Sequence, residues 1–426
     1  MIVKSLRLSN FRNYAAQEIQ FPPGLIAFTG DNGQGKTNLL EAICVLATTK
    51  SPLVERDKEL IRWHERATRL YAEIELEAGR GDARRLEYSW RIEGNSIGRE
   101  MKIGGVPQSA VASWLGQLQV VAFFPHDLTL LSGEPEERRR FLNLELGKTQ
   151  PAYFQDVAKY RRALQQRNAL LRHLIDARIG KSAPGEDKGT LGEWNRQVVG
   201  YGSRILSARA RFFSELAPIL TRIHAKLSGL DADFSIEYLP GLSILKNNPH
   251  PGGGFSVPFN ASIERDHADD MRRGITSSGP HRDDMIFRLG EMDLRRFGSQ
   301  GQQRLAVLAL KVALAHWVRE STGEPPILLL DDALSELDAT RRALLLEEAR
   351  SFPQSVVTAT DATFLSGAAA LYTVREGRIV EVGAQTEKEA ENPAENENES
   401  EAEKAPKSTE SENQVENEPI LADLTV

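Results

Sequence analysis

The chain has 426 residues, of which 40% are hydrophobic and 27% charged, a balance typical of a globular protein that buries a sizeable core. Its formal net charge of −7 is unevenly distributed: residues 386–426 carry 13 acidic and 3 basic side chains, which leaves +3 on residues 1–385. A mildly basic body permits nucleic acid as a partner without demanding it. The single cysteine, Cys44, excludes an intramolecular disulfide and a CxxC metal site.

The sequence also argues against a membrane protein. No stretch approaches the roughly 18 consecutive apolar residues of a membrane span. The first 14 residues carry Lys4, Arg7 and Arg12, so they lack the apolar core of a signal peptide. One cysteine fits a reducing compartment. We therefore expect a cytoplasmic protein with no membrane partner.

Residues 1–134 form the first predicted unit, the N-terminal part of an α/β domain. The apolar run 25–30 ends in glycine, as a buried strand does before a loop, and 38–48 has apolar residues at helical spacing. Alternating apolar and polar residues then predict antiparallel strands, and a further apolar run predicts another buried strand. The antiparallel strands are expected at 69–78, 84–94 and 100–106, and the buried strand at 117–124.

Residues 135–230 form the second predicted unit, an inserted helical arm. Pro135, Glu136 and Glu137 suit the first turn of a helix. Arginine-rich helical segments run from there to about 178 and again from about 190 to 228, and a loop rich in glycine, proline and lysine separates them at 180–189. The pattern predicts a helical hairpin that projects from the domain.

Residues 231–384 form the third predicted unit, which returns to the α/β domain after a loop at 249–254. Buried strands are predicted at 325–332 and 354–360, with a helix between them that starts near Asp338. A terminal hairpin should turn at Glu376 and Gly377. Strands that alternate with helices at both ends of the chain favour a mostly parallel sheet, which the arm interrupts.

Residues 385–426 form an acidic tail that is low in aromatics and rich in Glu, Asn, Ser and Pro. Such a composition cannot bury enough apolar surface to fold, which predicts a disordered appendage. Two other interpretations stay open: a segment that imitates nucleic acid, and a segment that binds a partner. Composition favours a solvating tail over both.

Residues 30–37, GDNGQGKT, fit the pattern G-x-x-x-x-G-K-[ST] between a predicted strand and a predicted helix. Glycines let successive backbone N–H groups point at the phosphates of a nucleotide, and the helix adds its positive dipole end. Lys36 would reach the β- and γ-phosphates, and Thr37 would ligate Mg²⁺. The alternative is an ordinary glycine-rich turn. The nucleotide-binding candidates are Gly30, Asp31, Asn32, Gly33, Gln34, Gly35, Lys36 and Thr37.

Two acids, Asp331 and Asp332, end an apolar strand. Uncompensated carboxylates in such a place are costly, so they indicate a nearby cation. We expect Asp331 to share Mg²⁺ with Thr37, and Asp332 to face the attacking water as the catalytic carboxylate. The alternative is a pair of helix-capping acids in a strand–helix loop. Asp338, a few residues on, suits the N-cap of the next helix.

Residues 298–304, GSQGQQR, place small and neutral side chains ahead of an apolar helix. The Ser299 hydroxyl, the Gly301 amide and the helix N-terminus can bind an anion without a formal charge. The phosphate loop already binds one nucleotide, so this second anion-binding group has no ligand within its own chain. In a two-fold dimer, Ser299, Gly301 and Gln302 of each copy would close over the γ-phosphate held by the other. A plain helix cap is the alternative.

Together these motifs resemble the ATP-binding-cassette heads of the SMC-like DNA-repair ATPases, and within that group the RecF family. The likeness covers about residues 1–383. It implies an α/β ABC-ATPase head with a mixed sheet and an inserted helical hairpin arm, with ATP and Mg²⁺ bound. It also implies catalytic roles for Lys36, Asp332 and Ser299. The shared motifs are LSNFRNY at 8–14, NGQGKTNLLEAI at 32–43, GEPEERRRFLN at 133–143, GPHRDD at 279–284, SQGQQR at 299–304 and LLLDDALSELD at 328–338.

The resemblance implies a function as well. Such a protein binds DNA in an ATP-dependent manner at single-stranded gaps and duplex junctions. It works with RecO and RecR and helps to load RecA in gap repair, replication recovery and the SOS response. Most cassette ATPases have glutamate where Asp332 stands, and the shorter acid predicts weak hydrolysis. The resemblance implies that DNA stimulates this hydrolysis. Thr360 and Asp361 stand where many have a histidine, so the sensor of the γ-phosphate stays open.

DNA is expected along the arm, through charge-driven contacts that do not read bases. For each residue the alternative is a solvated helix face with intrahelical ion pairs. Arg282 is expected to pair with Asp283, Asp284 or the nucleotide, and His281 suits a structural role equally well. The candidate contacts are Arg138, Arg139, Arg140, Lys159, Arg161, Arg162, Arg167 and Arg172.

Three other functions are weighed against this one. A transporter ATPase subunit shares the nucleotide motifs but normally has a much shorter segment between the phosphate loop and the second glycine motif. A chromosome-condensing SMC protein needs several hundred residues of coiled coil, which 426 residues cannot hold. An ATP-gated clamp with negligible turnover would be a binding module more than an enzyme.

Overall fold

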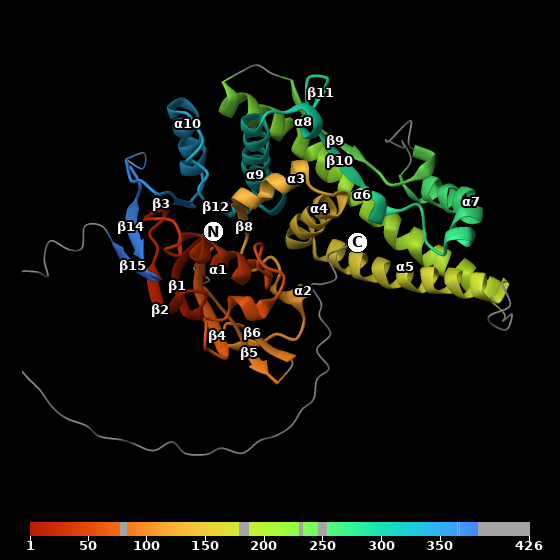
Figure 1. The fold of residues 1–426 in the computed structure, drawn as a ribbon, viewed down its shortest axis with the longest axis horizontal. Coiled ribbons are helices and arrows are strands. Elements are labelled where there is room, and N and C mark those ends of the chain that lie inside the picture. The colour runs from red at the N-terminus through yellow and green to blue at the C-terminus, as the bar shows by residue number, and fades with distance from the viewer. Residues whose placement is uncertain are drawn as a thin grey trace, which may run out of the picture.

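Two six-stranded sheets and a three-stranded sheet form the framework of the residues that the computed structural model describes, which are 1–76, 83–94, 96–178, 187–229, 233–245, 254–363, 365 and 367–381. The predicted acidic tail and most of the predicted loops 180–189 and 249–254 lie outside these residues. Figure 1 shows the two large sheets on one side of the molecule and the long arm helices on the other.

The central sheet is mixed, with the strand order β15-β14-β3-β13-β12-β8. Five of its strands run parallel, and β15 pairs antiparallel with β14. Apolar runs such as ILLL form its strands because both faces of this sheet are buried. The predicted α/β core with a mixed sheet is confirmed. The strands are β3 (Gly24–Thr29), β8 (Val120–Phe123), β12 (Ile327–Leu330), β13 (Gln354–Thr358), β14 (Ala370–Arg375) and β15 (Arg378–Glu381).

This sheet separates two hydrophobic cores, because successive side chains of a strand point to opposite faces. Leu25 and Leu330 belong to the core shared with the helices of the arm side, and Ile26 and Leu329 belong to the core beneath the second sheet. The carboxyl ends of the parallel strands meet at one edge, where the loops after β3 and β12 flank β13. The helices against this sheet are α1 (Lys36–Thr48), α9 (Gln300–Thr322) and α10 (Ala339–Arg350).

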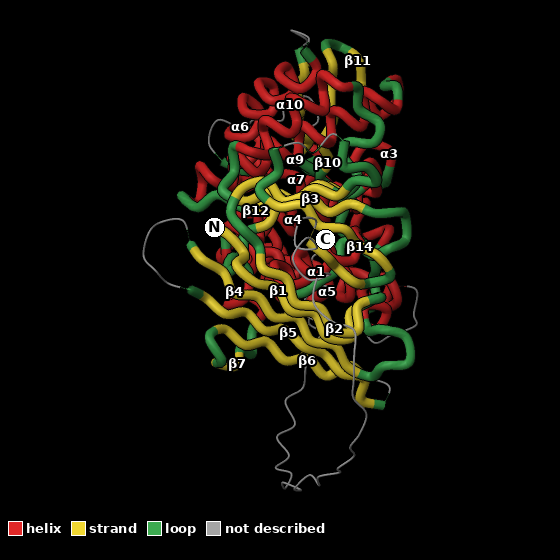
Figure 2. Tube along the Cα trace, turned by 90° about the vertical axis from the view of Figure 1, so that its left-hand side faces the viewer, coloured by secondary structure: helices red, strands yellow, loops and turns green. Residues whose placement is uncertain are grey.

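The second sheet is antiparallel throughout, with the order β2-β1-β4-β5-β6-β7. Leu70 and Leu86 point into the core beside α1. Figure 2 shows the opposite face with no helix over it. Exposed ion pairs such as Arg7–Glu18 cross that face. The predicted antiparallel strands are confirmed. The strands are β1 (Ile2–Phe11), β2 (Tyr14–Gln20), β4 (Ala67–Glu75), β5 (Arg84–Glu93), β6 (Ser96–Ile103) and β7 (Val106–Pro107).

The predicted arm helices are present, and α5 lies beside the first part of the longer α6 (Figure 1). They run antiparallel, since Arg204 of α6 donates to Asp156 near the start of α5 and Arg167 of α5 donates to Asn195 near the start of α6. Each of the first two arm helices begins at a proline, a residue suited to the first helical position. The arm helices are α4 (Pro135–Thr149), α5 (Pro151–Arg178) and α6 (Asp187–Ser228).

The elements that follow the predicted arm boundary at 230 also pack on the arm. The third sheet, of order β11-β10-β9, lies against α6, and α7 lies against α5 and α6. The boundaries between the predicted units stay a prediction. The remaining elements are β9 (Phe234–Leu239), α7 (Ser256–Arg273), β10 (Asp284–Leu289), β11 (Met292–Asp293) and the short helices α2 (Val111–Trp114), α3 (Thr129–Ser132) and α8 (Leu294–Phe297).

A buried ion pair, Arg209–Asp283, joins the arm to the segment before β10. Arg209 donates to Asp283 at 2.5 Å and to the carbonyl oxygen of Pro280 at 2.7 Å, and both charged side chains are almost fully buried. Tyr238 also donates to the Asp283 carboxylate. Burial raises the pKa of Asp283, while Arg209 and Tyr238 oppose the rise. The carboxylate therefore depends on these partners to stay ionised.

Replacing Arg209 by methionine should lower the free energy of unfolding by about 3 kcal/mol, because it leaves a buried carboxylate without its counter-ion. Arg209 lowers the pKa of Asp283 in the folded chain, so its loss raises this pKa further above the unfolded value of about 4, and the variant loses more stability than the unchanged chain as the pH rises above that value. The loss should therefore be larger at pH 8 than at pH 5. Urea unfolding at both pH values measures this.

Arg204→Met provides the matched control. Arg204 is 54% exposed and pairs with Asp156 on the surface of the same arm, so its loss should cost less than about 1 kcal/mol. Equal losses from the two variants, or a larger Arg209 effect at pH 5, would contradict the assignment.

No helix in the described part of the chain combines the length and apolar composition needed to cross a bilayer.

Candidate nucleotide-binding site

Residues 30–35 curl between β3 and α1 with backbone angles that glycine adopts freely. Gly30, Gly33 and Gly35 have φ values of +138°, +80° and +117°. A Cβ on Gly35 would lie 2.5 Å from the side-chain nitrogen of Asn13, and a Cβ on Gly30 would collide with the carbonyl oxygen of Val374. The loop therefore stays tight, and its amides gather at the N-terminus of α1, where an anion is favoured.

Lys36 opens α1 and folds back over this loop. Its Nζ donates to the carbonyl oxygens of Gly30 at 2.5 Å and Asp31 at 2.8 Å. Burial lowers the pKa of Lys36, and the nearby carboxylates of Asp332 and Asp331 oppose this effect. The ammonium thus lies beside both the loop carbonyl oxygens and the two predicted acids.

Thr37 and Asp331 lie together, as a shared metal ion requires. The Thr37 Oγ1 is 3.1 and 2.9 Å from the two carboxylate oxygens of Asp331. Two oxygens bound at adjacent octahedral positions of one Mg²⁺, each at roughly 2.1 Å, lie roughly 3 Å apart. These two residues therefore fit a Mg²⁺ ion, which would supply the charge that balances phosphate oxygens.

Thr358, at the end of β13, is a member of this group that the sequence reasoning missed. Its hydroxyl donates to Asp331 Oδ1 at 2.8 Å and accepts from the Asp332 N–H at 3.0 Å. Asp331 is 3% exposed; burial raises its pKa, while the Thr358 and Thr37 hydroxyls lower it. Only the order of the strands in the sheet brings Thr358 to the site, because β13 lies between β3 and β12.

Asp331→Asn should stabilise the protein in the absence of nucleotide and Mg²⁺. The raised pKa of Asp331 means that its ionised form opposes folding above the unfolded pKa of about 4, so the gain is present at pH 7 and shrinks as the pH falls. We expect a gain of about 1 kcal/mol in urea unfolding at pH 7. Adding Mg²⁺ with ATP should then stabilise the variant less than the unchanged chain. A lower stability at pH 7 would contradict this.

Asp332 is held through its backbone. It has φ +48°, its N–H donates to Thr358, and its carbonyl oxygen accepts from Arg304 Nη2 at 2.7 Å. The carboxylate is partly exposed and lies near Lys36. Asp338, further along the same loop, caps α10 by accepting from the Arg341 N–H, so this predicted cap is confirmed.

Ser299 caps α9 in a capping box with Gln302. The Ser299 hydroxyl accepts from the Gln302 N–H at 3.3 Å, and the Gln302 side chain accepts from the Ser299 N–H at 2.9 Å. Both residues and Gly301 are exposed, and the space beside Gly301 is open. Within the described residues, no hydrogen bond or ion pair joins 299–302 to 30–37.

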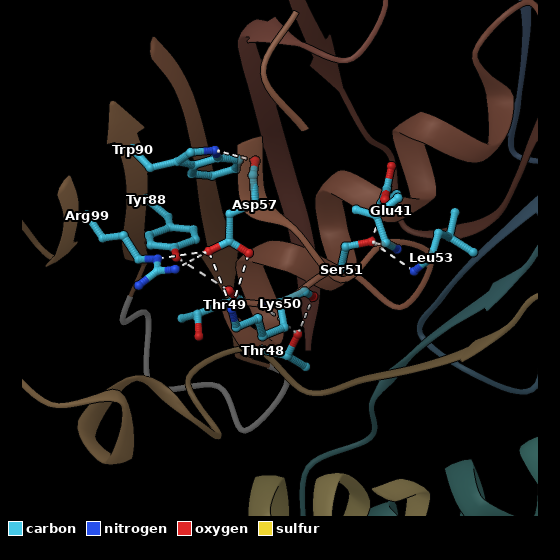
Figure 3. Close-up of polar contacts among 11 residues, drawn as sticks. Glu41, Thr48, Thr49, Lys50, Ser51, Leu53, Asp57, Tyr88, Trp90 and Arg99 are labelled. Carbon is cyan, nitrogen blue, oxygen red and sulfur yellow. Dashed lines mark hydrogen bonds and ion pairs between the residues drawn. The ribbon is translucent and has the colours of Figure 1, made fainter. Parts of the chain in front are cut away.

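Two carboxylates outside the predicted site, Glu41 and Asp57, form ion pairs that join α1 and the segment after it to the antiparallel sheet. Glu41, fully buried in α1, accepts from Arg12 through both of its oxygens at 2.7 Å. Asp57 lies between Lys50 and Arg99, which donate to it from two sides (Figure 3). They fix the helix of the phosphate loop against the antiparallel sheet. Arg12 belongs to the LSNFRNY motif and Glu41 to the NGQGKTNLLEAI motif, but neither sequence motif showed that the two side chains pair.

The structure leaves Thr360 and Asp361 at the surface. Asp361 accepts from the Thr363 N–H at 2.9 Å and is exposed. No hydrogen bond to Asp331 or Asp332 is described for either residue. The sensor of the γ-phosphate stays unassigned.

The structure corrects several predicted DNA contacts. Arg138 and Arg167 are buried, with 1% and 0% exposure, and pair with Asp284 and Asp270, so they cannot reach a DNA backbone. Arg139 is half-buried and donates to the carbonyl oxygen of Asp283. Arg161 is half-buried too. The candidates that remain exposed are Arg140, Lys159, Arg162 and Arg172.

The expected pairing of Arg282 with Asp283 or Asp284 is wrong, while its pairing with the nucleotide stays a prediction. Asp283 is held by Arg209, and Asp284 by Arg138, whereas Arg282 is exposed. His281 is structural: its ring contacts the Tyr160 hydroxyl at 2.8 Å and the Thr276 carbonyl oxygen at 3.0 Å. Burial lowers the pKa of His281 to about 3, so it stays neutral.

Residues 2–380 match the family described as RecF/RecN/SMC N terminal domain. Among curated proteins, the DNA replication and repair protein RecF of Natranaerobius thermophilus is 37% identical over 374 residues, covering 86% of this chain and 93% of the relative. The RecF of Desulfitobacterium hafniense (strain DCB-2) is 37% identical over 383 residues, covering 89% of this chain and 99% of the relative.

Solved structures resemble the chain as well. The recombination mediator protein RecF with ATP, of the RecFOR pathway, has a TM-score of 0.78 at 26% identity and covers 89% of this chain and 97% of its own. An Smc head domain from Pyrococcus furiosus has a TM-score of 0.51 at 16% identity, covers 89% of this chain and 96% of its own, and shows a shared fold alone.

Proposed function

We propose, since the chain belongs to the RecF branch of the RecF/RecN/SMC family, that it is a cytoplasmic, ATP-dependent DNA-binding protein of DNA replication and repair. One observation carries the nucleotide part of the proposal. Lys36 and Thr37 of the phosphate loop meet Asp331, which lies 294 residues after Thr37, at the edge of the central sheet. ATP with Mg²⁺ is the ligand this arrangement fits.

ATP would join two chains. Each chain presents an exposed, capped helix N-terminus at Ser299, and among the described residues no hydrogen bond or ion pair joins it to the phosphate loop of the same chain. In a two-fold pair, the helix of one copy would close over the γ-phosphate held by the other. Phe297, 70% exposed beside this corner, supports a surface that becomes covered.

Lys36, Asp332 and Ser299 would act on the γ-phosphate, with Gly301 and Gln302 beside it. Lys36 and the loop amides would hold the phosphates, and Asp332 would accept a proton from the attacking water. Its carboxylate is one methylene shorter than the glutamate of most cassette ATPases, which supports slow hydrolysis. DNA would stimulate it by favouring the paired state.

The DNA would be single-stranded, gapped or a duplex junction, and RecO, RecR and, indirectly, RecA would be the partners in gap repair, replication recovery and SOS induction. Arg140, Lys159, Arg162 and Arg172 are exposed on the arm side and suit phosphate contacts. Retention on gapped DNA with ATP, compared across salt concentrations, tests this part.

Lys36→Arg should weaken ATP binding about tenfold and remove ATP-dependent retention on gapped DNA. The broader guanidinium does not fit where the Lys36 ammonium lies 2.5 Å from the Gly30 carbonyl oxygen. Titration with a fluorescent ATP analogue and retention on gapped DNA measure the two effects. Lys4→Arg is the control, because the Lys4 side chain is 55% exposed. Unchanged ATP-dependent retention would refute the proposal.

Two other functions predict different outcomes. A transporter ATPase subunit should associate with membranes when cells are fractionated. That function does not account for the long arm between the phosphate loop and the second glycine motif of this chain. An ATP-gated clamp should pair on ATP without measurable release of phosphate.

A further inference from the structure

Arg304 lies in α9, five residues after Ser299, and reaches the loop that carries Asp332. Its Nη2 donates to the carbonyl oxygen of Asp332 at 2.7 Å and to the Ser335 hydroxyl at 3.3 Å. Its Nη1 pairs with Glu336 at 2.9 Å. One side chain thus joins the helix of the second glycine motif to the loop of the predicted catalytic acid.

Burying the charged side chain of Arg304 at this position costs free energy. It is 4% exposed, and its Nε is buried with no hydrogen-bond partner among the described residues. Such unsatisfied donors are rare in folded proteins and call for a reason. Its guanidinium carbon also lies 5.9 Å from the centre of the Phe123 ring, against the strand next to β12. The side chain thus lies between the sheet and the loop.

A plain ion pair does not account for this arrangement. Glu336 is 66% exposed, so the ion pair adds little to the stability of the fold, although its carboxylate still holds one end of the guanidinium. The shorter contact goes to the backbone of Asp332, whose φ is +48°, a conformation that needs support in a residue other than glycine. The fork of an arginine holds that carbonyl and Glu336 together, and a lysine cannot.

We propose that Arg304 is a positioning residue that couples the two nucleotide sites of the dimer. The inference rests on the proposed pairing of two chains by ATP. In each chain, Asp332 faces its own nucleotide, and Ser299 faces the nucleotide of the other copy. Arg304 fixes the distance between them, so the position of Asp332 at one site sets the position of the Ser299 corner at the other.

The first test is hydrolysis by Arg304→Lys. We expect kcat to fall about tenfold while ATP binding by the single chain stays unchanged, because Arg304 touches no nucleotide. Arg342→Lys is the matched control: Arg342 donates to the Leu334 carbonyl oxygen of the same loop at 2.8 Å, but from α10. Equal kcat values for the two variants, or a change in ATP affinity alone, would overturn the proposal.

The second test separates coupling from local support. A mixture of chains carrying Ser299→Arg with chains carrying Lys36→Ala has one complete site, in which the first chain supplies Asp332 and the second supplies Ser299. Arg304→Lys is then placed in either chain. Coupling predicts a several-fold loss of hydrolysis from either placement. A loss of hydrolysis from only one placement would show that Arg304 affects only its own chain's contribution to the site. No loss from either placement would show that it affects neither. Both outcomes overturn the proposal.

Glu336→Gln keeps the test decisive where Arg304→Lys does not fold, since an exposed side chain is replaced by one of the same shape. We expect a loss of about two- to threefold with the same pattern in mixed chains, and unchanged hydrolysis would overturn the proposal. The proposed function fails separately. If unmodified chains do not pair on ATP, the function is wrong; if they pair and hydrolyse while Arg304→Lys behaves as Arg342→Lys, only the coupling is wrong.

Discussion

Replacing Ser299 by arginine should abolish the ATP-dependent pairing of two chains and leave ATP binding by a single chain intact. Ser299 is exposed at the start of α9, and the space beside Gly301 is open to an approaching phosphate. Arginine fills that space and removes the hydroxyl. We expect the dissociation constant of the dimer to rise at least about 1000-fold, or about 4 kcal/mol. Sedimentation and titration with a fluorescent ATP analogue measure the two properties.

Ser299→Thr is the matched control, because threonine keeps the hydroxyl and remains a good helix cap. It should pair on ATP almost as the unchanged chain does. Equal loss of ATP binding and of pairing in Ser299→Arg would remove the argument that this corner acts on the other copy.

Asp332→Asn should trap the ATP-bound dimer. Asparagine has nearly the same shape, so the bonds of the backbone to Thr358 and Arg304 persist, while the group that accepts the proton of water is gone. We expect hydrolysis to fall about 1000-fold, within the range for loss of a general base. Phosphate release measures the rate, and sedimentation after dilution measures how long the dimer lasts.

Asp338→Asn controls for the loss of a nearby acid, since asparagine also caps a helix and Asp338 serves α10. Its hydrolysis should match that of the unchanged chain. Intact hydrolysis in Asp332→Asn would show that the carboxylate has been assigned the wrong role.

The elements of the central sheet could be predicted because their signals are local. The run ILLL marks β12, the turn at Glu376 and Gly377 joins β14 to β15, and Asp338 caps α10. The phosphate loop is equally local, since its glycines and Lys36 lie within one stretch of the chain. A strand and a helix on either side were enough to place it.

The buried arginines could not be predicted, because their partners lie far along the chain. Arg138 meets Asp284 across 146 residues, and Arg167 meets Asp270 across 103. A local pattern shows an arginine on a helix and cannot show which face is covered. The packing of the third sheet and α7 on the arm decided this, and it turned several expected DNA contacts into internal ion pairs.

Thr358 and Arg304 were missed for a related reason. Thr358 ends a strand with nothing in the sequence to separate it from other strand threonines, and it meets Asp331 only because β13 lies next to β12. Arg304 was part of a motif that had been explained by its serine and glycine. Its role depends on a contact with a loop 28 residues further on.

Sedimentation of the chain with ATP, with ADP and without nucleotide, each with and without gapped DNA, tests the central claim most directly. A triphosphate that bridges two copies predicts a dimer with ATP and a monomer in the other two conditions, and the dimer should be the form that travels with gapped DNA. A monomer at saturating ATP, or a dimer whose amount is the same with ATP, with ADP and without nucleotide, would contradict the account.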